Sequence, residues 1–238
     1  MADVSGRPEG SGGPPNAWGQ AIAAFVVVGA LGGGLWVMQQ SSAKSSESTL
    51  TCSTSTPSAS AKASAPAAGK KKVDYLTGDQ LCLALNRPDL PTLLGTPGEK
   101  PTALGSADDG ISLGDGPSPE AKVVLSTYTV QLSASYDDYP VAGMADLLGG
   151  GAREQSVLGR PAVLYSNRTM GFTIRGDKSE SAPSHAARCL VVARDPKDGG
   201  GSYEVAVWRQ DSGTPDDAAL LRVAQTVLPT IPGWTPAL

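Results

Sequence analysis

The sixteen residues AKVVLSTYTVQLSASY at positions 121–136 carry the clearest structural signal in this chain. Val124, Tyr128, Val130, Leu132, Ala134 and Tyr136 share one parity, and Thr, Gln and Ser occupy most of the other. Successive side chains of a strand point to opposite faces, so this period of two predicts one long strand with one buried face.

Shorter patterns of the same kind follow along the chain. Further strands are predicted at 154–158, 162–166, 188–194 and 203–210, and a short one at 111–113. The glycine-rich segment 198–202 lies between the last two long strands and predicts a hairpin turn. These hairpin-like spacings favour an antiparallel sheet.

Helix signals separate the strands. Thr77 and Gln80 form a capping-box pattern, which predicts a helix with Leu81, Cys82 and Leu85 on one face and a short helical turn at 90–94. A short helix is predicted at 140–148 with its apolar side chains inward, and a final helix with Thr214 as N-cap and Pro215 at its first position. The inward residues of the short helix are Val141, Met144, Leu147 and Leu148. The element order predicts an α+β domain, an antiparallel sheet covered by helices.

Composition excludes several classes of function. The chain has 238 residues, one His, three Cys and a net charge of −4. A single His excludes multi-histidine metal sites, and three Cys exclude a Cys₄ zinc site within one chain. The negative charge argues against a nucleic-acid binder held by phosphate contacts. We therefore expect no metal, no cofactor and no nucleic-acid partner.

Residues 17–38 form an apolar run with no charged side chain. As a helix, 22 residues span about 33 Å, enough to cross a bilayer core of about 30 Å. The run predicts one transmembrane helix with the N-terminus in the cytoplasm; the alternative is a signal peptide cleaved after residues 41–43. Within the run, Gly29 and Gly33 form a small-xxx-small pair, which either packs two such helices together or reflects the general frequency of Gly in membrane helices.

The segments beside this run are too polar to fold. Residues 1–16 are a short Gly/Pro-rich head, and residues 39–72 contain 23 Ser, Thr, Ala or Pro. Such composition predicts a disordered stalk. The stalk ends in Lys70, Lys71 and Lys72, which are either a solvated spacer or an electrostatic contact with anionic lipids or wall polymers. Residues 73–238 remain as the globular domain, with 20 acidic and 13 basic side chains and a net charge of −7.

The three cysteines indicate whether the domain lies in an oxidising or a reducing compartment. Cys82 and Cys189 both fall at predicted core positions, and in an oxidising compartment they could form a disulfide. The alternative is two separate buried thiols. Cys52 lies in the stalk, where it is either free or links two chains.

Catalytic motifs are missing from the sequence. His185 lies in a loop-like stretch, and no particular Ser or Asp can be identified as its partner in a catalytic triad. Asp108, Asp109, Asp137 and Asp138 fit solvated acidic loops better than a cation site, and no catalytic, cofactor-binding or metal-binding residue is predicted. If the chain were an envelope hydrolase, Asp137, Asp138 or Glu154 would be the candidate carboxylates.

Two segments carry a resemblance to known proteins. Residues 81–85 (LCLAL) and 159–162 (GRPA), together with the head, anchor and stalk, resemble uncharacterised actinobacterial single-pass envelope proteins. The helix and strand order is also similar to small lipoprotein domains of the PsbP/Mog1-like type. The resemblance implies a location and a fold and brings no catalytic residue.

These features together predict a membrane-anchored extracytoplasmic module, not an enzyme, that binds a ligand or a partner. The bilayer is the expected partner of residues 17–38, and an envelope protein or a wall polymer that of the domain. The alternatives are an envelope hydrolase using carboxylates, or a structural spacer that forms a homodimer through Gly29, Gly33 and Cys52.

Overall fold

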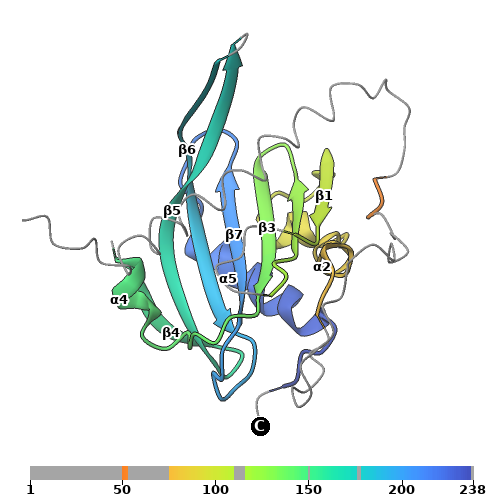
Figure 1. The fold of residues 1–238 in the computed structure, drawn as a ribbon. Coiled ribbons are helices and arrows are strands. Elements are labelled where there is room, and N and C mark those ends of the chain that lie inside the picture. Colours follow the sequence, from red (N-terminus) through yellow and green to blue (C-terminus); the bar gives the residue numbers. More distant parts are fainter. Residues whose placement is uncertain (1–49, 53–74, 110–115, 150, 176–177, 237–238) are drawn as a thin grey trace, which may run out of the picture.

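The computed structural model describes residues 50–52, 75–109, 116–149, 151–175 and 178–236. Its centre is a seven-stranded antiparallel sheet in the order β1-β2-β3-β7-β6-β5-β4 (Figure 1). The described part of the chain is thus mostly β, with a few helices. The strands are β1 (Ala103–Ala107), β2 (Glu120–Val124), β3 (Tyr128–Ser135), β4 (Arg153–Val157), β5 (Arg160–Arg175), β6 (Lys178–Ala193) and β7 (Ser202–Arg209).

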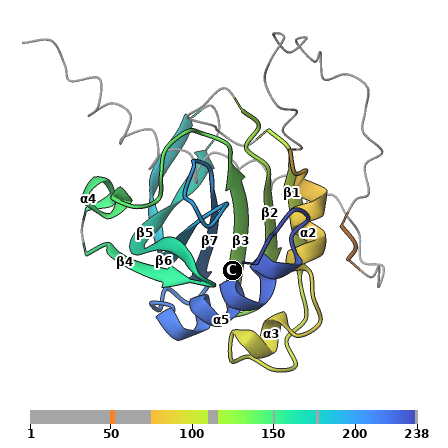
Figure 2. The ribbon, with the colours of Figure 1, turned by 90° about the horizontal axis from the view of Figure 1, so that it is seen from below.

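Three helices cover one face of this sheet. They are α2 (Gly78–Leu85), α3 (Leu90–Leu93) and α5 (Asp217–Val227), which continues into the 3₁₀ turn η1 (Leu228–Thr230). Figure 2 shows them on one side of the sheet, whereas α4 (Met144–Leu148) lies beside β5. The main core lies under α2 and α5 and includes the fully buried Leu81, Leu132 and Leu220.

The helix starts follow local chemistry. The Thr77 side chain accepts a hydrogen bond from the Gln80 backbone, and the Gln80 side chain accepts one from the Thr77 backbone, so the predicted capping box is confirmed. At α5 the prediction of Thr214 as N-cap is wrong, because the Asp216 side chain accepts from the Ala218 N–H and the helix begins at Asp217. The helix predicted at 140–148 begins only at Met144 as α4; Val141, before it, is buried as predicted, but Leu147 in α4 is 44% exposed.

The predicted single strand over residues 121–136 is wrong. The chain turns at residues 125–127, where the Leu125 N–H donates to the Tyr128 carbonyl, and β2 and β3 form a hairpin. On β3 the even-numbered residues are buried as predicted, but on β2 the buried residues are Ala121 and Val123. The turn changes which residues are buried, from odd-numbered ones on β2 to even-numbered ones on β3. The sequence did not reveal this turn, because an apolar residue at position 125 is compatible with a strand as well as with a buried turn.

The hairpin of β5 and β6 is longer than predicted. Each strand has 16 residues, and Figure 1 shows the pair extending past the neighbouring strands. The other predicted strands correspond to β4 and β7, and β6 pairs with β7 through the expected turn. The strand predicted at 111–113 lies outside the described residues.

The cysteine pairing differs from the predicted one. Cys52 and Cys82 form a disulfide, and Cys189 is a buried free thiol. Cys82 lies in the main core under α2, whereas Cys189 belongs to a second cluster on the opposite face of the sheet. The sheet separates the two sulfur atoms, so the predicted Cys82–Cys189 bond is wrong, and the bond to Cys82 also leaves no thiol at Cys52 for a link between two chains.

The predicted membrane segment is not among the residues that the structure describes. Within the described ranges, no helix is long and apolar enough to cross a bilayer. Residues 17–38, with Gly29 and Gly33, lie outside those ranges, as do Lys70, Lys71 and Lys72.

Candidate functional site

The face of the sheet opposite α2 and α5 carries a group of half-buried polar side chains. We call this group the polar face. It consists of Glu120, Lys122, Gln131, Ser133, Glu204 and Trp208 on β2, β3 and β7.

Strand register brings these residues together from distant parts of the chain. Lys122 is opposite Gln131, and Gln131 is opposite Ala206. Ala206 is in turn opposite Cys189, which is opposite Tyr165. One row therefore crosses five strands, and the small Ala206 lies at its middle with Glu204 and Trp208 two positions away on the same strand and face.

The row ends at a buried hydrogen-bond network. The Tyr165 hydroxyl donates to Glu204 Oε1 at 2.8 Å, and the Cys189 thiol lies close enough to influence the pKa of this carboxyl. Burial raises the pKa of the Glu204 carboxyl, and these two groups oppose the rise only in part. Burial and the nearby carboxyl also raise the pKa of both Tyr165 and Cys189 well above their ordinary values. The arrangement therefore favours a neutral phenol that donates to Glu204 and a neutral thiol beside it.

A cation lies on the β2 side of the same face. Lys122 Nζ is 5.5 Å from the centre of the Trp208 ring, and desolvation lowers the pKa of Lys122 while Glu120 opposes the shift. Glu120 Oε2 in turn accepts a hydrogen bond of 3.2 Å from Gln131 Nε2. The polar face thus offers a cation, an indole ring and two carboxyls within a few strands.

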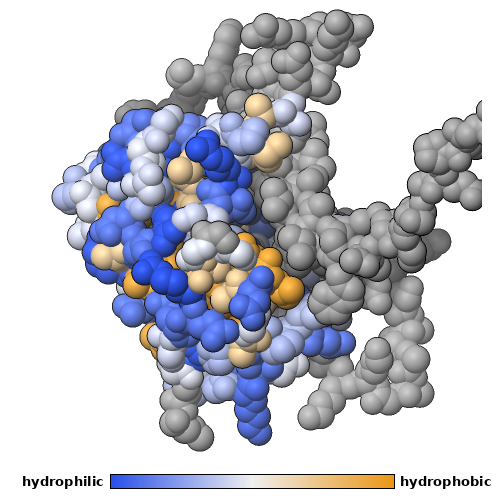
Figure 3. Space-filling model, turned by 90° about the vertical axis from the view of Figure 1, so that its left-hand side faces the viewer, coloured by the Kyte–Doolittle hydropathy of each residue, from blue (hydrophilic) through white to orange (hydrophobic). Residues whose placement is uncertain are grey.

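The second core cluster borders the polar face. Val141 and the partly buried Met144 and Leu148 pack over Val163 and Cys189. Figure 3, seen from the side of α4, shows a mainly hydrophilic surface with apolar areas in it. The α4 segment therefore covers the β5 and β6 end of this face, and the β2, β3 and β7 end carries the polar groups.

The carboxylates proposed for a hydrolase serve as turn contacts. Asp137 Oδ1 accepts from the Tyr139 N–H at 2.9 Å, and Glu154 Oε1 accepts from the Gly143 N–H at 2.8 Å. No hydrogen bond that the structure describes joins Asp137, Asp138 and Glu154 to one another. His185 lies in β6 and not in a loop, and its buried Nδ1 has no hydrogen-bond partner. The hydrolase alternative therefore gains no geometric support from these residues.

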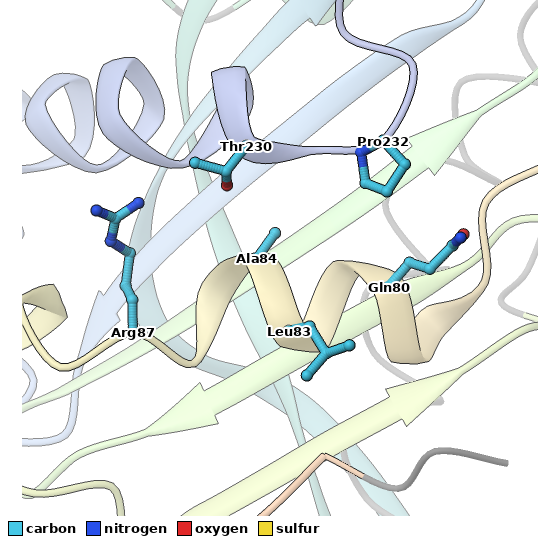
Figure 4. A pocket seen from close by; sticks show the side chains of 6 residues that line it. All are labelled: Gln80, Leu83, Ala84, Arg87, Thr230 and Pro232. Carbon is cyan, nitrogen blue, oxygen red and sulfur yellow. The ribbon is translucent and has the colours of Figure 1, made fainter.

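A shallow groove of about 280 Å³ lies between α2 and the segment that contains η1 (Figure 4). The guanidinium of Arg87 at this groove is already paired, because Nε and Nη2 donate to Asp89 and Nη1 donates to the Thr226 carbonyl. The groove therefore offers little free polar chemistry. Its lining residues are Gln80, Leu83, Ala84, Arg87, Thr230 and Pro232.

Comparison with known proteins gives one family. The sequence profile of a family of unknown function, DUF6215, matches residues 13–151, which is more than half of the chain. The chain belongs to the DUF6215 family. No curated protein and no solved structure matches it significantly. The matched range of this DUF6215 member ends before β4, yet β7 pairs directly with β3, so the residues after the match complete the same sheet.

Sequence reasoning missed Lys122, Glu204 and Trp208 as a group. The polar parity of β3, with Gln131 and Ser133, was the available signal. It shows that β3 has a second face but not which residues of β2, β5 and β7 lie beside it. Only the strand register supplies those neighbours.

Proposed function

We propose that residues 73–238 form an extracytoplasmic binding module that takes a polar ligand or partner segment on the polar face. The observation that carries this proposal is the Glu204 carboxyl, which is half-buried and accepts from the Tyr165 phenol with no described cation among its hydrogen-bond partners. A ligand that supplies a strong hydrogen-bond donor lowers the free energy of a desolvated carboxyl. Lys122 above the Trp208 ring adds a charge and a flat apolar surface for the same ligand.

The location outside the cytoplasm is supported by the disulfide. Disulfides persist in oxidising compartments, and the Cys52–Cys82 bond joins the segment after the apolar run to the domain. We propose that residues 17–38 hold the chain in the cell membrane as a single span with a cytoplasmic N-terminus. The resemblance to actinobacterial envelope proteins and to PsbP/Mog1-like domains belongs to the same proposal. The proposed partner of the domain is an envelope protein or a wall polymer. Residues 17–38 of two chains would form the alternative homodimer.

Photo-crosslinking in intact cells tests the binding surface. A photo-reactive amino acid replaces Ser133 on the polar face, and a matched one replaces Gln225, which is exposed on α5 on the other side of the sheet. We expect a discrete crosslinked species from position 133 and not from position 225. We also expect it to be lost in Glu204→Gln, which keeps an acceptor for Tyr165 but removes the carboxylate.

Equal crosslinking at both positions, or crosslinking that Glu204→Gln leaves unchanged, would contradict the binding surface.

The location of the domain has a separate test, in which a cysteine replaces the exposed Ser212. A membrane-impermeant thiol reagent should label it in intact cells. Labelling only after lysis would show that the domain is cytoplasmic.

A further inference from the structure

Two arginines lie at the end of the sheet where β5 and β7 begin and β6 ends. Arg160 is fully buried, with its guanidinium 3.5 Å from the centre of the Trp234 ring. It donates only to backbone carbonyls, those of Ala193, Arg194 and Thr235, and its Nε has no partner. A positive charge is therefore fixed inside this end of the domain without an ion pair among the described residues.

The guanidinium of the second arginine, Arg194, stacks with its flat face on aromatic rings, and its N–H groups have no described acceptor. Its guanidinium lies 4.0 Å from the centre of the Tyr136 ring and 6.0 Å from that of Tyr203. No described residue accepts a hydrogen bond from this side chain or forms an ion pair with it, and its Nε is buried without a partner. Stacking on a ring uses the flat face of a guanidinium and leaves its N–H edge for a planar acceptor.

The carboxylates near Arg194 are already engaged in turns. Asp195 accepts from the backbone N–H groups of Lys197 and Gly199. Asp198 accepts from those of Val141 and Ala142, at 2.8 and 2.7 Å. Neither can turn toward Arg194 without losing both backbone contacts, and no described carboxylate, including that of Asp138 beside Gly200, forms an ion pair with Arg194.

At the other end of β7, an arginine stacks on a tyrosine in the same way and also pairs with a carboxylate. Arg209 lies 5.1 Å from the centre of the Tyr128 ring, directly across the strand pair. Its N–H edge is filled by Asp211, with Nε to Oδ1 at 2.8 Å and Nη2 to Oδ2 at 2.5 Å. Arg209 therefore has both the ring and the carboxylate, whereas Arg194 has only the ring.

We propose that Arg194 is the recognition residue of a binding site for a carboxylate supplied from outside the chain. The carboxylate would bind at Nη1 and Nη2 of Arg194, because Nε is buried, and the charge of Arg160 nearby favours an anion at this place. The site goes beyond the proposed function. It lies at the rim of the helix-covered face, with Tyr203, and not on the polar face with Glu204.

Arginine side-chain NMR tests this site in the full-length chain in detergent, with its disulfide intact. The Nε–Hε signals are followed in ¹⁵N-arginine-labelled protein while sodium acetate replaces sodium chloride at constant ionic strength, and Arg194→Lys assigns the signal. We expect a saturable shift of the Arg194 signal and none of Arg209. Acetate should also raise the thermal midpoint, and Arg194→Lys should weaken the affinity for acetate about tenfold, because lysine keeps the charge but loses one of the two parallel hydrogen bonds.

A matched variant creates the same arrangement at the other end of β7. In Asp211→Ala the edge of Arg209 loses its carboxylate, so the Arg209 signal should begin to respond to acetate. An Arg194 signal that does not respond to acetate, or responds equally to chloride, would overturn the proposal. A response to inorganic phosphate but not to acetate would overturn the carboxylate as the ligand class, and an Arg209 that stays unresponsive in Asp211→Ala would overturn the stacking argument. None of these readouts depends on Glu204, so they can fail independently of the proposed function.

Discussion

Removal of the Cys52–Cys82 disulfide should destabilise the domain by an amount that the loop length sets. The two cysteines are 30 positions apart in the chain. The chain-entropy model assigns a closed loop of about 30 residues roughly 3.6 kcal/mol of stabilisation at 25 °C. Packing contributes less, because replacement by Ala removes only one sulfur atom each from the buried Cys52 and Cys82. The expected loss therefore comes mainly from the greater freedom of the unfolded chain.

Urea unfolding of the full-length chain measures this loss. The double variant Cys52→Ala/Cys82→Ala should unfold with a free energy about 3.6 kcal/mol lower than the parent chain. For a domain of this size the thermal midpoint should fall by roughly 7–14 °C. Reductant should produce the same change in the parent chain and none in the double variant, which is the matched control.

A loss below about 1 kcal/mol would refute the reasoning, because loop closure would then contribute far less than the model requires. A reductant effect of equal size in the double variant would refute the pairing itself. Non-reducing peptide mapping gives an independent check, with Cys52 and Cys82 in one linked species and Cys189 as a free thiol.

Three other results are expected. Leu132→Ala should lower the free energy of unfolding by about 2–5 kcal/mol, since Leu132 is fully buried in the main core; a loss below about 1 kcal/mol in urea unfolding would contradict this placement. Thr77→Ala should cost about 1 kcal/mol by removing the capping box with Gln80, whereas Thr77→Ser should cost less. Because the folded pKa of Glu204 is raised above its ordinary value of 4.5, the contribution of Glu204 to stability should be fully present below that value and should be lost as the pH rises through the folded pKa. Glu204→Gln keeps the acceptor for Tyr165 and should reduce this loss, and an unchanged pH profile would show that another group causes it.

Much of the local structure could be predicted because its causes lie within a few residues. The capping box needs only Thr77 and Gln80, four positions of one turn, and it starts α2 where expected. The alternation in β3 and the glycine-rich turn before β7 are likewise contained in short windows. The antiparallel arrangement follows from the short connections between such strands.

The candidate site could not be predicted, because its residues are neighbours only through the sheet. Tyr165 and Glu204 are 39 positions apart and meet through the register of β5, β6 and β7. A shift of one residue in either pairing would place Tyr165 and Glu204 on opposite faces of the sheet. No local pattern near Glu204 carries that information.

The cysteines and arginines show the same division most clearly. The amino-acid sequence places Cys82 on a buried helix face and Arg194 at the end of a predicted strand, and both placements follow from local periodicity and turn chemistry. The tertiary structure alone puts the sheet between Cys82 and Cys189 and brings Cys52 to Cys82. It also leaves Arg194 on Tyr136 without a carboxylate while Arg209 has Asp211. These contacts depend on how distant segments pack together, and packing is a property of the whole folded chain that no short window of sequence contains.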